Sequence, residues 1–308
     1  MSASSTPRAP FQLARLTALC AIPLVLFGGS VTTLEAGMKV EGWLIAEGHF
    51  MVLFPVESWF RDQGTMVEHT HRLFGTLVGL LAIATVVATW RSKSNAQAKL
   101  LSAGALLAVI LQGTIGGFRV LENSPQLAFL HGSLAHAVLA LLVATAVYLS
   151  PGWQGSAENP SQAPKSLARL SLVATLVVYS QVVAGAWYRH ALRDAAEPHM
   201  MRFLLHVTLA FGVVGVLASL TVFLKKVGSP GALRARRGLV HLLGLQFLLG
   251  ILAWLGFQEG SVGALEWVLS IAHVLCGGLL LSQTLIVHMW AVRACASSAH
   301  PATSVELN

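Results

Sequence analysis

The stretch from residue 69 to residue 90 reads HTHRLFGTLVGLLAIATVVATW, and it carries no Asp, Glu, Lys or Arg after Arg72. A helix rises 1.5 Å per residue, so about 20 apolar residues are enough to cross a bilayer. Seven more runs of this kind lie near residues 13–34, 99–118, 127–149, 167–188, 203–224, 238–256 and 265–288. The sequence therefore predicts an all-α integral membrane protein with eight transmembrane helices.

The composition agrees with this class. Only 11% of the 308 residues are charged and 55% are hydrophobic, whereas a soluble domain carries about 25% charged residues. The eight runs take up most of the chain and leave no room for a sizeable soluble domain.

The distribution of charge predicts the orientation in the membrane. Lys and Arg gather in the two ends of the chain and in every second loop, whereas most Asp and Glu lie in the other loops. Cytoplasmic loops carry the excess of basic residues, so both termini are expected in the cytoplasm. The net charge of +7 is then a signal of topology, and nucleic-acid binding is not expected.

The first apolar run reads as an uncleaved anchor because no clear small-x-small cleavage site precedes a polar mature start. The chain also has no Arg-rich transit peptide, which favours a bacterial inner (plasma) membrane over an organelle. Three cysteines, Cys20, Cys276 and Cys295, lie in or beside apolar runs. A structural disulfide on the outer face is therefore not expected.

The outer loop at 35–68 is rich in aromatic residues, including Trp43, Phe54 and Trp59. Long loops in compact proteins are lids, binding segments or disordered tethers, and the aromatic content favours a lid over something apolar.

Three of the predicted helices share a Gln followed four residues later by Gly. The pairs are Gln112 with Gly116, Gln181 with Gly185, and Gln246 with Gly250. Small residues let helices approach and a Gln amide bonds across their interface, so helix packing explains the pattern. A second, compatible interpretation is that these faces line a ligand cavity.

The second, fourth, sixth and eighth predicted helices each have a histidine close to the outer end: His71, His131, His206 and His273. The pattern predicts two pseudo-symmetric four-helix bundles in parallel repeat, with all four histidines near one level. We expect an N-terminal tail at 1–12, an N-terminal half at 13–150, a cytoplasmic linker at 151–166, a C-terminal half at 167–290 and a cytoplasmic tail at 291–308.

Two histidines in each half suggest two metal sites, because ionisable groups inside a bilayer are functional by default and neutral imidazole is a common metal ligand. No cluster of Cys, Asp or Glu suits zinc or a di-iron centre. Two imidazoles among small residues such as Gly132 and Gly278 suit a flat porphyrin, so bis-His heme follows. We expect packing for His136, and solvated loop positions for His49, His190 and His199.

Heme carries two propionates, and Arg is the best carboxylate clamp. Snorkelling to the interface is the alternative for any single arginine. The candidates at outer helix ends are Arg72, Arg119, Arg189, Arg193 and Arg202.

At this point the motifs resemble those of the heme A synthase family. EHTHR at 68–72 matches its Glu-x-x-His-Arg motif, and GGSVTTLEAGMKVEGW, LQGTIGG, GAWYRH, HGSLA and IAHVLCGG fall where the family has corresponding motifs. The resemblance covers residues 13–290. It implies oxidation of a methyl group of heme O to a formyl group to give heme A for terminal oxidases, with heme b as cofactor and heme sites toward the outer face.

The resemblance also implies a division of labour. His71 and His131 would hold the substrate heme, and His206 and His273 would hold heme b. Glu68 would act beside the substrate, as a proton acceptor or as a charge that stabilises the oxidised carbon. Three residues separate Glu68 from His71, so both would share a helix face about 60° apart, whereas His69 would face elsewhere.

Some family members have a cysteine pair in the first outer loop, and this chain has none there, so it resembles the cysteine-free bacterial branch. The implied partners are heme O, heme O synthase, cytochrome oxidase assembly factors and an electron acceptor of unknown identity, and a homo-oligomer stays open. A non-enzymatic bis-His diheme b-type cytochrome is the alternative, and a transporter is disfavoured because the polar signals lie near the outer face.

Overall fold

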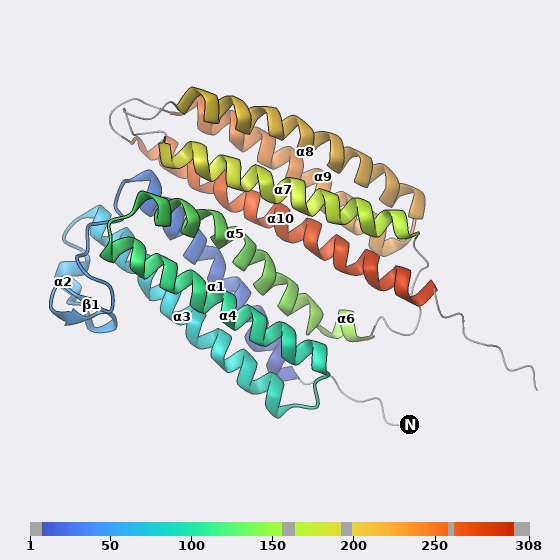
Figure 1. Ribbon diagram of the computed structural model, residues 1–308, viewed down its shortest axis with the longest axis horizontal. Helices are drawn as coiled ribbons and strands as arrows, with labels where there is room; N and C mark the ends of the chain where they lie inside the picture. Colours follow the sequence, from blue (N-terminus) through green and yellow to red (C-terminus); the bar gives the residue numbers. More distant parts are fainter. Residues whose placement is uncertain (1–7, 156–163, 192–198, 258–261, 299–308) are drawn as a thin grey trace, which may run out of the picture.

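The computed structural model describes residues 8–155, 164–191, 199–257 and 262–298. Within them, eight helices are long and apolar enough to cross a membrane, which confirms the predicted class (Figure 1). They are α1 (Arg8–Thr33), α3 (Gln63–Arg91), α4 (Ala96–Leu121), α5 (Pro125–Tyr148), α7 (Lys165–Ala191), α8 (His199–Val227), α9 (Pro230–Leu255) and α10 (Ala264–Ser298).

The short elements lie between these helices. The outer loop holds β1 (Ile45–Ala46), β2 (His49–Phe50), a 3₁₀ turn η1 (Met51–Leu53) and α2 (Val56–Trp59). We call residues 35–62 the cap. The short helix α6 (Pro151–Gly155) opens the predicted linker, of which residues 156–163 lie outside the described part of the chain, as do 1–7 and 299–308 in the tails. The predicted domain boundaries stay predictions.

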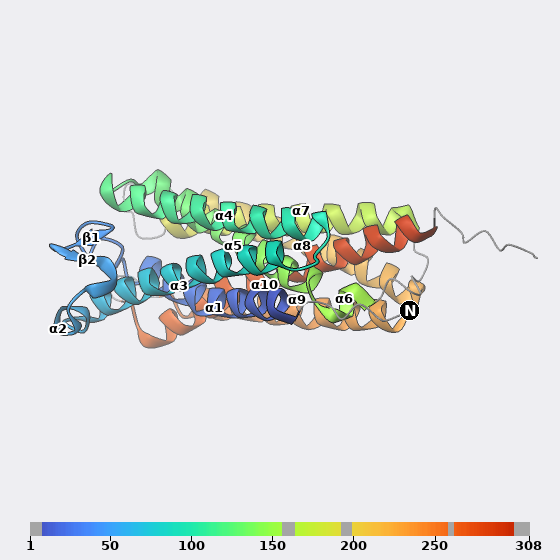
Figure 2. The same ribbon diagram turned by 90° about the horizontal axis from the view of Figure 1, so that it is seen from below.

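The helices group into two cores. One cluster of buried apolar side chains comes mainly from α1, α3, α4 and α5, and another comes mainly from α7 to α10. Leu139 of α5 and Val274 of α10 belong to the first cluster, while Ala140 belongs to the second, so α5 and α10 join the two groups. Figures 1 and 2 show the cap at one end of the bundle and the start of α1 at the other.

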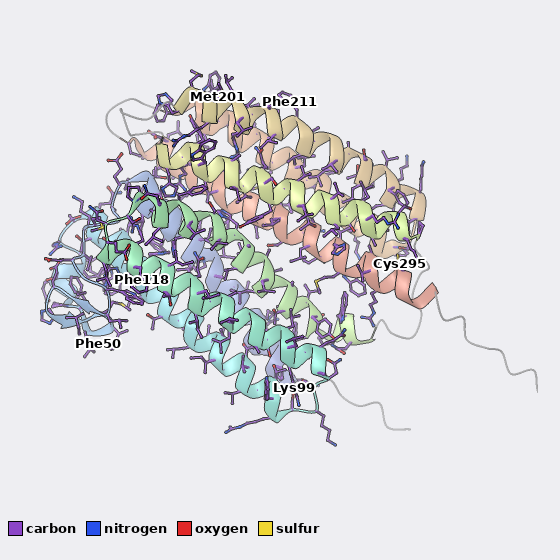
Figure 3. All side chains as sticks on the ribbon, in the orientation of Figure 1. Phe50, Lys99, Phe118, Met201, Phe211 and Cys295 are labelled. Atoms are coloured by element: carbon purple, nitrogen blue, oxygen red, sulfur yellow. The ribbon has the colours of Figure 1, made fainter. Side chains whose placement is uncertain are left out.

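Many large apolar side chains face away from both cores. Figure 3 shows Phe118, Met201 and Phe211 on the outside of the bundle, and 46%, 69% and 63% of their respective surfaces are exposed. In water such exposure would be unfavourable, but in a bilayer lipid tails surround these side chains.

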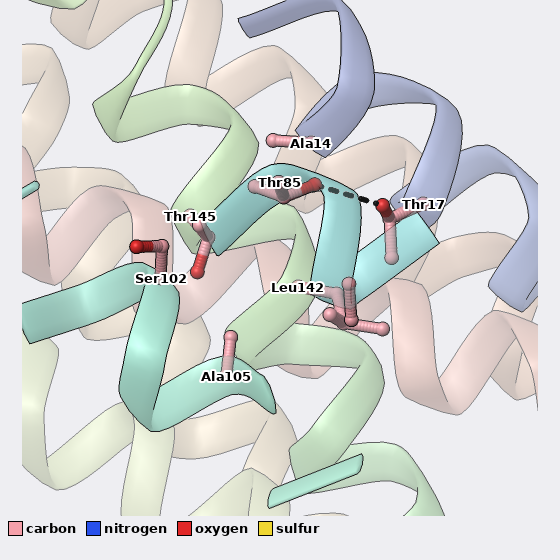
Figure 4. A pocket seen from close by; sticks show the side chains of 8 residues that line it. Ala14, Thr17, Thr85, Ser102, Ala105, Leu142 and Thr145 are labelled. Atoms are coloured by element: carbon pink, nitrogen blue, oxygen red, sulfur yellow. Dashed lines mark hydrogen bonds between the residues drawn. The ribbon is translucent and has the colours of Figure 1, made fainter. Parts of the chain in front are cut away.

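The N-terminal core also contains a polar contact between helices (Figure 4). Hydroxyls of four helices line a cavity of about 10 Å³, the size of a single water, and each donates to a carbonyl of its own helix. Thr17 of α1 and Thr85 of α3 also meet, with 3.3 Å between their hydroxyl oxygens. Hydroxyls satisfied in this way let the helices approach closely inside a membrane.

Helix α3 begins six residues earlier than the apolar run predicted, at Gln63. The reason is the N-cap, where Asp62 accepts from the backbone N–H of Thr65 over 2.9 Å. Glu68 therefore lies inside a helix and not in the loop, which the sequence analysis had extended to residue 68.

Replacing Asp62 with alanine is expected to cost about 1 kcal/mol of stability. The backbone N–H and the hydroxyl of Thr65 hold the pKa of Asp62 below its usual value. A lowered folded-state pKa means that the stabilisation is present above the unfolded pKa of about 3.9 and is lost as the pH falls through the folded value. Thermal unfolding in detergent should separate wild type from Asp62→Ala at pH 7 and bring them together in acid. Glu41→Ala, an exposed cap carboxylate, is the control, and equal melting temperatures at pH 7 would contradict the assignment.

Candidate functional site

The fold brings the four predicted histidines together in two pairs. The ring centroids of His71 and His131, the N-terminal pair, lie 6.2 Å apart with ring planes at 87°. Those of His206 and His273, the C-terminal pair, lie 6.3 Å apart at 82°. Each histidine lies six to nine residues after the first residue of its helix. All four therefore lie at similar depths, as predicted.

The spacing of each pair fits two imidazoles on one metal. A metal–imidazole bond is about 2 Å long, so imidazoles on opposite sides of one ion have centroids about 6 Å apart. In the described residues no group of three or more His, Cys, Asp or Glu side chains could hold a metal ion. A metal between two histidines would need further ligands from a group such as a porphyrin, so the residues fit bis-His heme.

Each histidine of the N-terminal pair is seated against the preceding spanning helix. His71 Nδ1 lies 3.1 Å from the Leu24 carbonyl, and His131 Nδ1 lies 3.1 Å from the Gln112 carbonyl. An Nδ1–H that donates to a carbonyl fixes the tautomer and leaves Nε2 as the free ligand atom. The imidazoles rest on Gly28 and Gly116, where a Cβ would come within 2.8 Å and 2.7 Å of the rings.

The C-terminal pair contacts the preceding spanning helices through glutamine side chains instead. Gln181 Nε2 lies 3.1 Å from His206 Nδ1, and Gln246 Nε2 lies 3.2 Å from His273 Nε2. In the described part of the chain His273 Nδ1 has no hydrogen-bond partner, unlike Nδ1 of the N-terminal pair. The rings of His206 and His273 rest on Gly185 and Gly250. In the sequence pattern, Gln and the Gly four residues later therefore mark the place where a helix contacts the imidazole of the next spanning helix.

The corresponding contact site for the fourth histidine, His71, was not recognised in the sequence. In α1 the residues are Leu24 and Gly28, and leucine in place of glutamine hid the pattern. The signal that was available is the Gly28–Gly29 pair near the outer end of α1.

Gly185→Ala is expected to displace His206 and weaken heme binding to the C-terminal pair at least about tenfold, the usual scale for loss of a ligand's support. The added Cβ would lie 2.8 Å from the imidazole. Gly215→Ala on α8 is the matched control because nothing lies within 4 Å of its Cβ position. Heme content per purified chain is the measurement, and equal content in both variants would contradict the seating.

Glu68 is buried, with 2% of its surface exposed, and it faces the cap. Its Oε2 accepts from the backbone N–H groups of Lys39 and Val40 over 2.7 Å and 2.9 Å. Its Oε1 accepts from Arg72 Nη2 over 2.8 Å. Arg72 also donates to the carbonyls of Val40 and Gly42. This ion pair therefore fastens the cap to α3, a role that the sequence did not predict for either residue.

His69 also faces the cap. Only 1% of its surface is exposed, and its ring centroid lies 4.7 Å from that of Phe54 and 5.2 Å from that of Trp59. The indole N–H of Trp59 donates to Thr70 Oγ1 over 3.1 Å. Three consecutive residues of α3 thus hold the cap while His71 turns into the bundle, so His69 points elsewhere, as expected.

Two further arginines lie near the pairs. Arg119 Nη1 donates to the Gly37 carbonyl over 3.0 Å, and Arg189 Nη2 donates to the Gly29 carbonyl and to Thr33 Oγ1. Within the described ranges neither guanidinium has a carboxylate within 4.0 Å. Arg202 stacks on Trp187, 4.8 Å from the ring centroid, and Arg193 lies outside the described residues.

One expectation for the remaining histidines was wrong. His190 is not in a solvated loop: it lies at the end of α7, with its ring centroid 6.4 Å from that of Phe129 and against Gly132 of α5. The helix extends past the predicted span end at 188, which carries His190 into the contact. His136 packs as expected, with its ring nitrogens 3.1 Å and 3.2 Å from the carbonyls of Gly132 and Val274.

Comparison with curated proteins gives relatives named heme A synthase. The chain is 30% identical over 173 residues to one from Symbiobacterium thermophilum, covering 54% of each chain. It is 25% identical over 183 residues to one from Alkalihalophilus pseudofirmus, covering 57% of this chain and 58% of the relative. For one from Brucella ovis, 30% identity extends over 127 residues, 39% of this chain and 34% of the relative. The matches thus span about half the length of the first two relatives.

The family model described as "Cytochrome oxidase assembly protein" (COX15-CtaA) matches residues 11–195. This segment contains Glu68, the N-terminal pair and the seats of both, and it ends before the C-terminal pair. Because the match covers more than half of the chain, the protein belongs to the COX15-CtaA family of cytochrome oxidase assembly proteins.

Proposed function

We propose that the protein is a heme A synthase, an oxidoreductase that converts a methyl group of heme O into a formyl group. The conversion removes four electrons from the methyl carbon and adds one oxygen atom. The observation that carries the proposal is the presence of two separate histidine pairs, each spaced for one metal, in a chain of this family. One pair serves a substrate heme and the other a resident heme.

In this proposal the N-terminal pair holds heme O and the C-terminal pair holds heme b. Bound heme b supplies one-electron redox chemistry beside the substrate site. The asymmetry between the halves supports the assignment, because among the described residues the cap and the carboxylate that contacts it belong to the N-terminal half. A cap over one site excludes water from it, as an oxidation of a membrane-soluble substrate requires.

Glu68 acts in this proposal as a fixed negative charge. A carboxylate offers about four lone-pair positions, and two backbone N–H groups and Arg72 already donate to it. These contacts fix the position of the carboxylate against the cap. In this proposal it stabilises positive charge on the oxidised carbon, and proton acceptance is the other alternative from the sequence.

Arg119 and Arg189 take the propionates in this proposal. Each lies partly buried with only carbonyl or hydroxyl partners in the described part of the chain, and a guanidinium without a counter-ion favours a carboxylate ligand. Arg72 is a weaker candidate than the sequence suggested, because Glu68, Val40 and Gly42 occupy its donors.

We also propose the surroundings of the reaction. The basic ends of the chain support a cytoplasmic location of both termini. In this proposal the heme sites lie toward the outer face of a bacterial inner membrane. The first outer loop holds no cysteine, which supports the cysteine-free branch. Heme O synthase and oxidase assembly factors are the proposed partners.

The nearly equal spacing of the two pairs favours a second candidate, a bis-His diheme cytochrome that only transfers electrons. Expression in a bacterial strain that makes heme O but lacks heme A synthase separates the two. Appearance of an a-type oxidase in reduced-minus-oxidised spectra of the membranes supports the enzyme. Normal expression of the protein without any a-type oxidase would favour the cytochrome.

A further inference from the structure

The cap exposes large apolar side chains although it lies outside the eight spanning helices. Between 42% and 74% of the surface of each is exposed. Monomeric soluble proteins rarely expose a large contiguous apolar patch, and such a patch marks a contact with protein or membrane. We call these residues the cap face: Leu44, Ile45, Phe50, Val52, Leu53, Val56 and Phe60.

The cap face is separate from the interior of the cap. Val40, Ala46 and Phe54 form a small buried core with Met51 and Trp59 packed against it. Ile45 pairs directly with Phe50 across the hairpin, so both side chains point to one side, opposite to that of Ala46. The cap thus has an apolar interior and, apart from it, exposed apolar side chains, of which Ile45 and Phe50 share one side of the hairpin.

The hairpin holds this side in place. Its two-residue turn, Glu47–Gly48, has positive φ at both positions, 48° and 83°, which is the turn that fits a tight hairpin. The other anchors are buried contacts of Glu68 and His69 with the cap. The apolar side chains are therefore presented by a fixed structure.

The cap face adjoins the lipid-facing surface of the bundle. Trp43 packs on Phe118 at the outer end of α4, with ring centroids 6.3 Å apart, and a Cβ on Gly117 would collide with the Trp43 ring. Phe118 faces outward, and Leu44 follows Trp43 in the chain. Figure 1 shows the cap at the outer ends of α3 and α4, on the side away from α7–α10.

Charge at the hairpin tip is compensated. Arg61 donates to both carboxylate oxygens of Glu47 over 2.6 Å and 2.7 Å. The hydrogen bond lowers the pKa of Glu47 and raises that of Arg61, so both groups stay ionised as a pair across the neutral range. An ion pair at the hairpin turn next to exposed apolar side chains suits the interface between headgroups and acyl chains.

We propose that the cap face inserts into the outer leaflet and binds phospholipid at the boundary between headgroups and acyl chains. Continuity with the lipid-facing end of α4 favours lipid over a protein partner, because the bilayer already surrounds Phe118. This inference is independent of the reaction at the histidine pairs.

The test places an environment-sensitive fluorophore on single cysteines in the full chain, with Cys20, Cys276 and Cys295 replaced by alanine. The labelled variants are Leu53→Cys and Phe60→Cys, and His49→Cys is the matched control because it is exposed on the other side of the hairpin from Phe50. Heme content confirms that each variant is folded. The protein is reconstituted in phosphatidylcholine vesicles, and quenching by nitroxide lipid is compared with quenching by aqueous iodide.

Nitroxide lipid should quench the labels at 53 and 60 severalfold more strongly than the label at 49, and iodide should show the reverse order. Equal, iodide-accessible quenching at all three positions would overturn the proposal. Protection from both quenchers at 53 and 60 would overturn it as well, in favour of a second copy or another protein on the cap face.

Discussion

Glu68→Ala is expected to lower heme A formation about 100-fold or more, the scale for removing one fixed charge partner from a reacting centre, while the C-terminal pair keeps its heme. Glu68 contacts only the cap and Arg72 among the partners found for its carboxylate. The backbone N–H groups of Lys39 and Val40 would lose their acceptor, and Arg72 would be left buried without its counter-ion. Both losses fall on the N-terminal half.

The measurement is heme A relative to heme O in extracts of cells that express each variant, together with heme b per purified chain. Glu57→Ala removes an exposed carboxylate of the cap and serves as the control. Conversion unchanged by Glu68→Ala would remove this residue from the mechanism. Loss of heme b in the same variant would mean that Glu68 supports the whole fold and not the substrate site.

The second large effect concerns the histidine pairs. His206→Ala or His273→Ala is expected to eliminate bound heme b, because each variant removes one of the two imidazoles that would hold it. His71→Ala or His131→Ala is expected to abolish conversion while heme b remains. The two pairs occupy different helices, α3 and α5 in one case and α8 and α10 in the other, so the effects should separate.

Heme content and the low-spin spectrum of the purified variants check this prediction. His199→Ala is the control, since His199 is exposed at the start of α8. Retention of heme b in His206→Ala together with its loss in His71→Ala would reverse the assignment of the two sites. Loss of all heme in all four variants would indicate one coupled site.

The fold was predictable because its main signal is local. Apolar runs of spanning length need no knowledge of neighbours, and all eight reappear as helices. The four histidines could be selected for a similar reason. One histidine lies near the same end of every second helix, and this regularity can be recognised from the positions in the sequence alone. The glycines at 116, 185 and 250 were visible, but their contact with an imidazole depends on which helices are neighbours.

The contacts of the cap were not predictable from the sequence. Spacing along a helix placed Glu68 on the face of His71, yet its carboxylate turns to backbone groups 28 and 29 residues earlier in the chain. Arg72 also donates to backbone carbonyls of the cap. Every residue has backbone donors and acceptors, so they carry no sequence signature. Contacts of the cap backbone with Glu68 and Arg72 can therefore be recognised only once the conformation of the cap is known. Leu24 escaped notice because its carbonyl, not its side chain, meets His71.

Extraction of the hemes from membranes of a host that supplies heme O and has no heme A synthase, with and without this protein, tests the proposed reaction when the hemes are identified by mass spectrometry. Heme A, or a hydroxylated heme O intermediate, is expected only when the protein is present. Recovery of heme b in the purified protein, with heme O unchanged in the membranes, would contradict the proposed reaction.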